Sequence, residues 1–98
     1  MQIMLVEDDD LLADGMVRAL KRDGFAVNRL RDGRSARDSM VVEAPDVLVL
    51  DLGLPDMDGL ETLEAIQKIN ADRPKEKQIG VIMLSSHTKK GADITVKA

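Results

Sequence analysis

Four short apolar runs alternate along this chain with stretches that mix polar and apolar residues. The runs cover residues 3–6, 25–30, 47–50 and 79–84. Their aliphatic and β-branched content is typical of strands. The stretches between them, at about 10–23, 33–42 and 59–70, place apolar residues at helical spacing. The pattern therefore predicts strands and helices in alternation, with a polar loop at 70–78.

Glycine and proline set the ends of the predicted helices. The first helix, at about 10–23, has an apolar face formed by Leu12, Met16, Ala19 and Leu20. Gly24 lies just beyond its end, where glycine is favoured because it adopts the left-handed backbone conformation without a steric penalty. The second helix must end before Pro45, because a proline disfavours the helical conformation in the residue before it.

Alternation of strand and helix predicts one α/β domain over residues 1–98, with a parallel sheet and helices on both faces. The run at 25–30 mixes polar and apolar positions, whereas the other three runs are almost purely apolar. We therefore place it at an edge of the sheet, which favours the doubly wound, flavodoxin-like strand order 2-1-3-4. In such sheets the functional site lies at the carboxyl ends of the strands, between the first and the third.

The composition narrows the classes of function. The net charge is -4, and the chain has no cysteine, tryptophan or tyrosine. An acidic chain matches nucleic acid poorly, and the lack of cysteine excludes disulfides and thiolate metal sites. With no basic leader and no long apolar segment, the sequence predicts a cytoplasmic protein without a nucleic-acid or membrane partner. We interpret a local basic cluster as a solvated face rather than a docking surface; it consists of Arg29, Arg31, Arg34 and Arg37.

Acidic residues follow two of the predicted strands. Glu7 and Asp8 come directly after the run at 3–6, and Asp51 comes directly after the run at 47–50. Because parallel strands end at the same edge of a sheet, we expect these carboxylates to lie together, where they would repel one another without a cation. Oxygen ligands with room for water and a phosphate suit Mg²⁺ better than zinc. We assign Asp9 or Asp10 to the N-cap of the first helix rather than to the ion.

Three stretches match a known family in their order and spacing. They are VEDDD at 6–10, LDLGLPDMDGL at 50–60 and VIMLSS at 81–86. They resemble the receiver domain of two-component response regulators, and the resemblance covers the whole chain. Residues 1 to about 60 are most similar to the winged-helix transcription-factor class, whereas residues 81–98 are similar to the chemotaxis methylesterase receiver. A hybrid or engineered chain would show this mixture.

The resemblance implies a phosphoacceptor site. Asp51 would take a phosphoryl group from a phosphohistidine on a histidine kinase, with Mg²⁺ as cofactor. Asp8 and Asp51 would bind the ion directly, Glu7 would act through water, and the backbone carbonyl of Gly53 would complete the protein ligands. Ser85 would donate a hydrogen bond to the new phosphate. Such a domain catalyses at most its own phosphorylation and dephosphorylation.

The resemblance also implies parts that this sequence does not show. TVKA, residues 95–98, would lie inside the fourth helix, and the fifth strand, its lysine and the fifth helix would be lacking; Lys97 does not fill the lysine's place. The strand at 79–84 would then be an open edge, so we expect self-association through it. The alternative is a truncated or engineered fragment that self-associates and no longer signals.

Two other classes of function fit the sequence less well. A flavodoxin-like electron carrier would need a phosphate-binding first loop, and the acidic residues at 7–10 would repel a phosphate. A phosphatase with an aspartyl nucleophile would need a second acid two positions after Asp51, and Gly53 occupies that position. Turnover of an outside substrate is therefore not expected.

Overall fold

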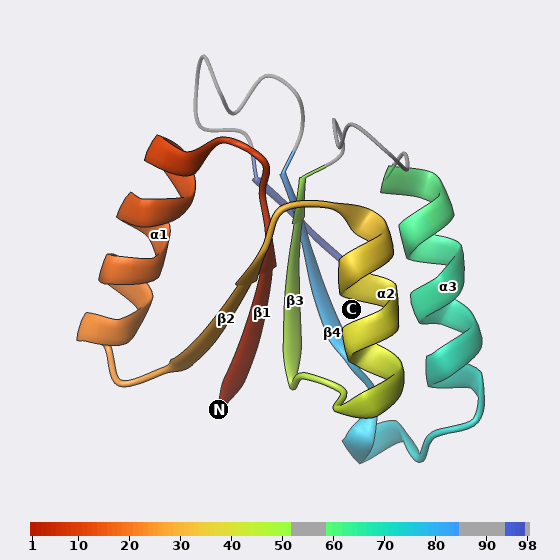
Figure 1. The fold of residues 1–98 in the computed structure, drawn as a ribbon. Helices are drawn as coiled ribbons and strands as arrows, with labels where there is room; N and C mark the ends of the chain where they lie inside the picture. The colour runs from red at the N-terminus through yellow and green to blue at the C-terminus, as the bar shows by residue number, and fades with distance from the viewer. Residues whose placement is uncertain (52–58, 85–93, 98) are drawn as a thin grey trace.

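The computed structural model describes residues 1–51, 59–84 and 94–97, which form one sheet with helices on both faces (Figure 1). The strands are β1 (Gln2–Val6), β2 (Ala26–Leu30), β3 (Val47–Asp51), β4 (Gly80–Leu84) and β5 (Ile94–Lys97). The helices are α1 (Asp10–Arg22), α2 (Gly33–Val42) and α3 (Gly59–Ala71), with a 3-10 turn at Lys75–Lys77. The predicted alternation of strands and helices is confirmed up to β4.

The strand order is β2-β1-β3-β4-β5, and the first four strands are parallel. The predicted order 2-1-3-4 is therefore confirmed, with the mixed-polarity strand β2 at an edge. Val6 is the register partner of both Leu30 on β2 and Leu50 on β3. The strands therefore end at the same level, and the residues that follow them are brought side by side.

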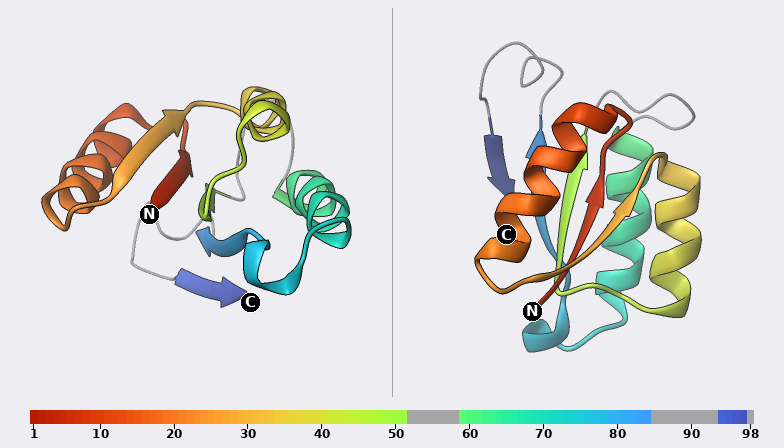
Figure 2. Two further views of the ribbon diagram at one scale, coloured as in Figure 1. Left: turned by 90° about the horizontal axis from the view of Figure 1, so that it is seen from below. Right: turned by 60° about the vertical axis from the view of Figure 1, so that its left-hand side comes forward.

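Helices lie on both faces of the sheet, as the view from below in Figure 2 shows, and an apolar cluster lies on each face. Helix α1 covers one face over Ile3 and Leu5, whereas α2 and α3 cover the other face over Met4 and Val6. Alternate residues of the same strand thus face opposite cores, because successive side chains of a strand point to opposite faces. Strands buried on both faces account for the nearly continuous apolar runs in the sequence.

Helix α1 is capped at its N-terminus by the side chain of Asp9 and at its C-terminus by backbone N–H groups that follow the helix. Asp9 is its N-cap and accepts a hydrogen bond from the Leu12 N–H at 3.0 Å, as expected for this residue type. Gly24 has a φ of 92°, and its N–H and that of Phe25 donate to carbonyls of the last turn. The predicted face of α1 was partly wrong: the packed face is Ala13, Met16, Val17 and Leu20, while Ala19 is exposed.

The end of the chain differs from the expectation. Residues 94–97 form β5, antiparallel to β4, instead of part of a helix, and Ile82 is the register partner of Val96. Ile94, Thr95 and Val96 are all β-branched and favour a strand, and pairing satisfies the backbone groups along β4. The expectation that β4 is an open edge, and hence the proposed edge for self-association, was therefore wrong. None of the helices in the described ranges is long and apolar enough to cross a membrane.

Candidate metal centre

Glu7, Asp8 and Asp51 converge at the carboxyl ends of β1 and β3. Asp51 is the last residue of β3, and Glu7 follows Val6, whose register partner on β3 is Leu50. One carboxylate oxygen from each of the three residues lies within 4.8 Å of the others. The side chains of Glu7 and Asp51 are 0% exposed, whereas Asp8 is half-buried. The convergence expected from the sequence is present in the structure.

Burial, and to a smaller extent the neighbouring acids, changes the titration of Glu7. Burial raises the pKa of Glu7 from its ordinary value of 4.5 to about 7, because the charged form is poorly solvated. The Asp9 N–H, which donates to Glu7 Oε2 at 3.0 Å, opposes this shift in pKa, whereas Asp8 and the charge of Asp51 add to it. Glu7 is therefore partly protonated near neutral pH, and a bound cation would favour its ionised form.

The chemistry of the donors fits a hard divalent cation. All three side chains offer oxygen, and the described residues offer neither a thiolate nor an imidazole beside them. Mg²⁺ prefers one or two carboxylates together with water and phosphate oxygens, whereas zinc prefers nitrogen and sulfur. A buried pair of acids next to a half-buried one supplies such a partial ligand set and leaves the outer side for other oxygens.

The turn between β1 and α1 is fixed by β2. The Glu7 N–H donates to the Leu30 carbonyl at 3.0 Å. The Glu7 carbonyl accepts two hydrogen bonds from Arg29, from Nε at 3.0 Å and from Nη2 at 2.8 Å. Both backbone polar groups of Glu7 are thus bound by the neighbouring strand, one by its main chain and one by a side chain.

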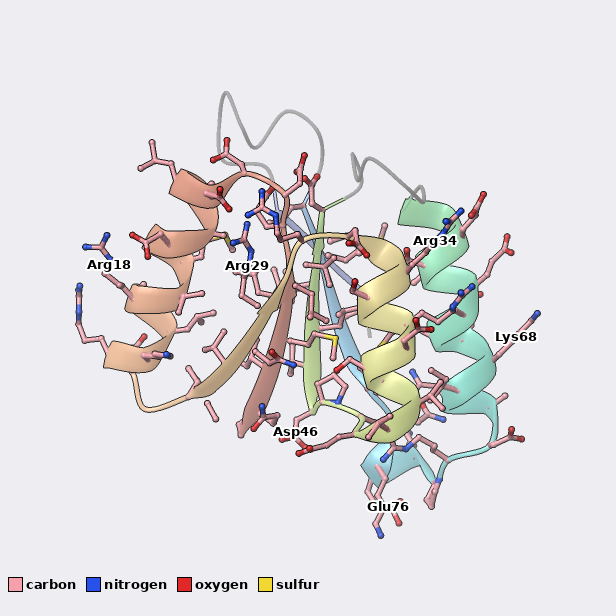
Figure 3. All side chains as sticks on the ribbon, in the orientation of Figure 1. Arg18, Arg29, Arg34, Asp46, Lys68 and Glu76 are labelled. Carbon is pink, nitrogen blue, oxygen red and sulfur yellow. The ribbon has the colours of Figure 1, made fainter. Side chains whose placement is uncertain are left out.

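Arg29 also reaches the first residue of α1. Its Nη2 lies 2.9 Å from Asp10 Oδ1, and Arg31 contacts the same oxygen. Hydrogen bonds from Arg29 and, to a smaller extent, from Arg31 lower the pKa of Asp10. In Figure 3 Arg29 lies between α1 and the sheet, whereas Arg18 projects from the far side of α1. Asp10 therefore anchors the start of α1 to the end of β2.

Reasoning from the sequence missed Arg29. The prediction of a solvated face formed by four arginines is wrong for this residue, because its side chain is only 24% exposed and is bound to the acidic turn. Arg37 does fit the earlier interpretation, because it is exposed and lies 3.9 Å from the neighbouring Asp38. One signal was available: Arg29 occupies a strand position whose neighbour in register is the fully buried Leu5.

Two predicted site residues, Gly53 and Ser85, lie outside the described residues. The structure does describe the strand ends that come before these two residues in the sequence. Asp51 ends β3, and its register partner on β4 is Leu84, the residue before Ser85. The roles of Gly53 and Ser85 therefore remain predictions.

Comparisons with known proteins show which family this chain is similar to. The family model "Response regulator receiver domain" matches residues 3–97. Transcriptional regulatory protein CseB of Streptomyces coelicolor is 38% identical over 84 residues, covering 86% of this chain and 33% of its own length. Protein-glutamate methylesterase/protein-glutamine glutaminase 1 of Dechloromonas aromatica is 41% identical over 98 residues, covering 97% of this chain and 26% of its own length. The chain thus spans about a third or less of these relatives.

Solved structures give the same result. The non-phosphorylated HemR receiver domain from Leptospira biflexa has a TM-score of 0.74 and 32% identity, covering 93% of this chain and 67% of that one. A LuxR-family DNA-binding response regulator from Staphylococcus aureus has a TM-score of 0.72 and 30% identity, covering 87% and 68%. The family match, the sheet order and the acidic cluster lead to one conclusion: this chain belongs to the receiver domain family of two-component response regulators.

Proposed function

We propose that Asp51 accepts a phosphoryl group from a phosphohistidine on a histidine kinase, with Mg²⁺ bound beside it. The observation that carries this proposal is the convergence of Glu7, Asp8 and Asp51 within 4.8 Å at the ends of adjacent parallel strands. Three acids in this position have no packing role, because burying carboxylates together costs free energy. Membership of the receiver family supplies the reaction class.

In this proposal each acid has its own task. Asp8 and Asp51 would bind the ion directly, Glu7 would act through water, and the Gly53 carbonyl would complete the protein ligands. When bound there, Mg²⁺ would supply positive charge to neutralise the phosphoryl oxygens. Ser85 donates a hydrogen bond to the phosphate after transfer. Its preceding residue, Leu84, is the register partner of Asp51, which supports this placement.

The transfer is a substitution at phosphorus. A carboxylate oxygen of Asp51 forms the new P–O bond while the P–N bond to the imidazole breaks, and the imidazole leaves with one proton from solvent. The buried position of Asp51, with an exposed fraction of 0%, excludes most water from this carboxylate. Positioning and charge neutralisation are the main requirements of such a transfer. In this proposal the buried carboxylate of Asp51 supplies the first, and Mg²⁺ held by the three acids would supply the second.

We propose that this domain acts on no outside substrate and catalyses at most the gain and loss of its own phosphoryl group. We propose that the domain meets its histidine kinase in the cytoplasm. We assign no nucleic-acid binding to the receiver domain itself. The relatives include transcriptional regulatory proteins and a protein-glutamate methylesterase, so the output depends on what else the full protein contains.

Mass spectrometry of the intact chain tests the proposal. Incubation with a small phosphodonor and Mg²⁺ should add one phosphoryl group, and a chelator should prevent it. Asp51→Asn should abolish the modification, whereas Asp46→Asn, at an exposed aspartate at the opposite end of the sheet, should not. Phosphorylation that persists in Asp51→Asn would refute the proposal.

A further inference from the structure

We propose that Arg29 is a positioning residue of the acidic site, and that it sets the affinity for Mg²⁺ by fixing the turn that carries Glu7 and Asp8. This inference rests on the proposed Mg²⁺ site. Arg29 lies on β2, so a residue on the edge strand would control ligands that belong to β1. It touches neither the ion nor the phosphoryl group in this proposal and acts through the Glu7 carbonyl and the Asp10 carboxylate.

The contacts of Arg29 are suited to this role. Its guanidinium holds the Glu7 carbonyl through Nε and Nη2, at 3.0 and 2.8 Å, and Asp10 Oδ1 through Nη2 at 2.9 Å. The planar guanidinium presents its donors in a fixed arrangement, so the carbonyl and the carboxylate are held at one relative position. Glu7 and Asp10 stand on either side of Asp8, and Arg29 therefore fixes the turn that contains this ligand.

The remaining bonds of the turn depend on the same position. The Asp9 N–H donates to Glu7 Oε2 at 3.0 Å, and the Asp9 side chain caps α1. If the Glu7 carbonyl were released, the chain would be free to rotate between Glu7 and Asp9, and Glu7 Oε2 would lose its fixed donor. Replacing a residue that hydrogen-bonds to a metal ligand and orients it commonly changes metal affinity by about 10- to 100-fold.

Electrostatics alone gives the opposite expectation. Arg29 carries a positive charge beside the acids, and removing a cation should strengthen the binding of another cation. A positioning role predicts that Arg29→Gln weakens Mg²⁺ binding even though the local charge becomes more negative. The direction of the change in Mg²⁺ affinity therefore separates the two explanations.

Arg31 provides the matched control. It contacts the same oxygen of Asp10 but makes no contact with the Glu7 carbonyl among the described residues. Arg31→Gln removes an equal charge from the same place and should leave Mg²⁺ affinity unchanged or slightly higher. Arg29→Lys keeps the charge without the planar set of donors, so its affinity should lie between those of the wild type and Arg29→Gln.

The experiment is a Mg²⁺ titration of the four proteins by NMR, together with amide hydrogen exchange in the metal-free state. We expect Arg29→Gln to raise the dissociation constant for Mg²⁺ at least about tenfold. In the metal-free protein it should accelerate exchange of the Asp9 amide and leave the amides in the middle of α3 unchanged, which also shows that the variant is folded. Arg31→Gln should leave exchange of the Asp9 amide unchanged and Mg²⁺ affinity unchanged or slightly higher.

The outcomes separate this inference from the proposed function. Wild-type protein that binds Mg²⁺, with Arg29→Gln binding it equally or more tightly, would overturn the role of Arg29 and leave the metal site standing. Wild-type protein that shows no Mg²⁺-dependent shifts would overturn both. A loss of affinity in Arg31→Gln equal to that in Arg29→Gln would show that charge at Asp10 matters, and not the Glu7 carbonyl.

Discussion

Val6 on β1 and Leu50 on β3 are register partners, and this relationship places Glu7 beside Asp51. A shift of the register by one residue would move one acid toward the opposite face of the sheet, because side chains alternate along a strand. The site therefore depends on pairing in the middle of the sheet as well as on the acids themselves.

The neighbouring acids Asp8 and Asp9 should respond differently to the same substitution. Asp8→Asn removes a proposed ligand and should weaken Mg²⁺ binding by more than about tenfold, or about 1.4 kcal/mol. Asp9→Asn should keep Mg²⁺ affinity, because asparagine caps a helix about as well as aspartate does. Calorimetric or NMR titration of both variants checks this. Equal losses of affinity would show that Asp8 contributes only general negative charge.

Glu7 makes the stability of the metal-free protein depend on pH. Its pKa is raised to about 7 in the folded state, so the folded state holds a proton that the unfolded state releases near pH 4.5. The contribution of Glu7 to stability is therefore complete below about pH 4.5 and is lost as the pH rises through about 7. We expect Glu7→Gln to remove this part of the dependence, because glutamine does not titrate.

Urea unfolding of wild type and Glu7→Gln, from about pH 5 to about pH 8, measures this effect in the difference between the two proteins. The single histidine, His87, is present in both and does not contribute to the difference. Added Mg²⁺ should oppose the trend in wild type, since it binds the ionised carboxylates. Parallel pH profiles for the two metal-free proteins would contradict the raised pKa of Glu7.

Pairing with β5 should protect the edge of β4. Val96→Pro removes a backbone N–H and restricts the strand conformation opposite Ile82, so we expect faster amide exchange at Val81–Leu84. An open β4 edge would also favour association, so sedimentation at micromolar concentration should show more dimer for the variant than for wild type. Exchange and sedimentation that match wild type in every respect would show that β5 does not cover β4 in solution.

Asn70 joins the end of α3 to the start of β4. Its side-chain Nδ2 donates to the Ile79 carbonyl at 3.0 Å, and its Oδ1 accepts from the Ile79 N–H at 2.7 Å. Asn70→Ala leaves both backbone groups of the buried Ile79 without these partners, which should cost about 1–3 kcal/mol of unfolding free energy. Gln67→Ala, at an exposed position of the same helix, should cost less than about 0.5 kcal/mol. Similar losses for the two variants would contradict the role of Asn70.

Much of the fold was predictable because local patterns agree with the final packing. Apolar runs gave four parallel strands, and the mixed polarity of the run at 25–30 identified the edge strand β2. The convergence of Glu7, Asp8 and Asp51 followed from one rule, that parallel strands end at a common edge. These features need no knowledge of distant contacts.

The features that were missed depend on contacts between distant parts of the chain. Arg29 lies 22 residues from Glu7, and its spacing to the other arginines resembles an ordinary polar surface. Strand β5 pairs with the edge of β4, which lies ten or more residues earlier in the chain. The resemblance to the family did not predict this pairing. On α1, two registers of apolar residues were available, and packing on Leu5 and Ile3 selected the one with Ala13 and Val17.

Localisation of the phosphoryl group tests the central claim most directly. The chain is incubated with a small phosphodonor in the presence and absence of Mg²⁺, digested at acid pH, and its peptides are sequenced by tandem mass spectrometry. The account predicts a single phosphoryl group on Asp51 that forms only with Mg²⁺ and that Asp8→Asn greatly reduces. A phosphoryl group on any other residue, or one that forms on Asp51 equally well without Mg²⁺, would contradict it.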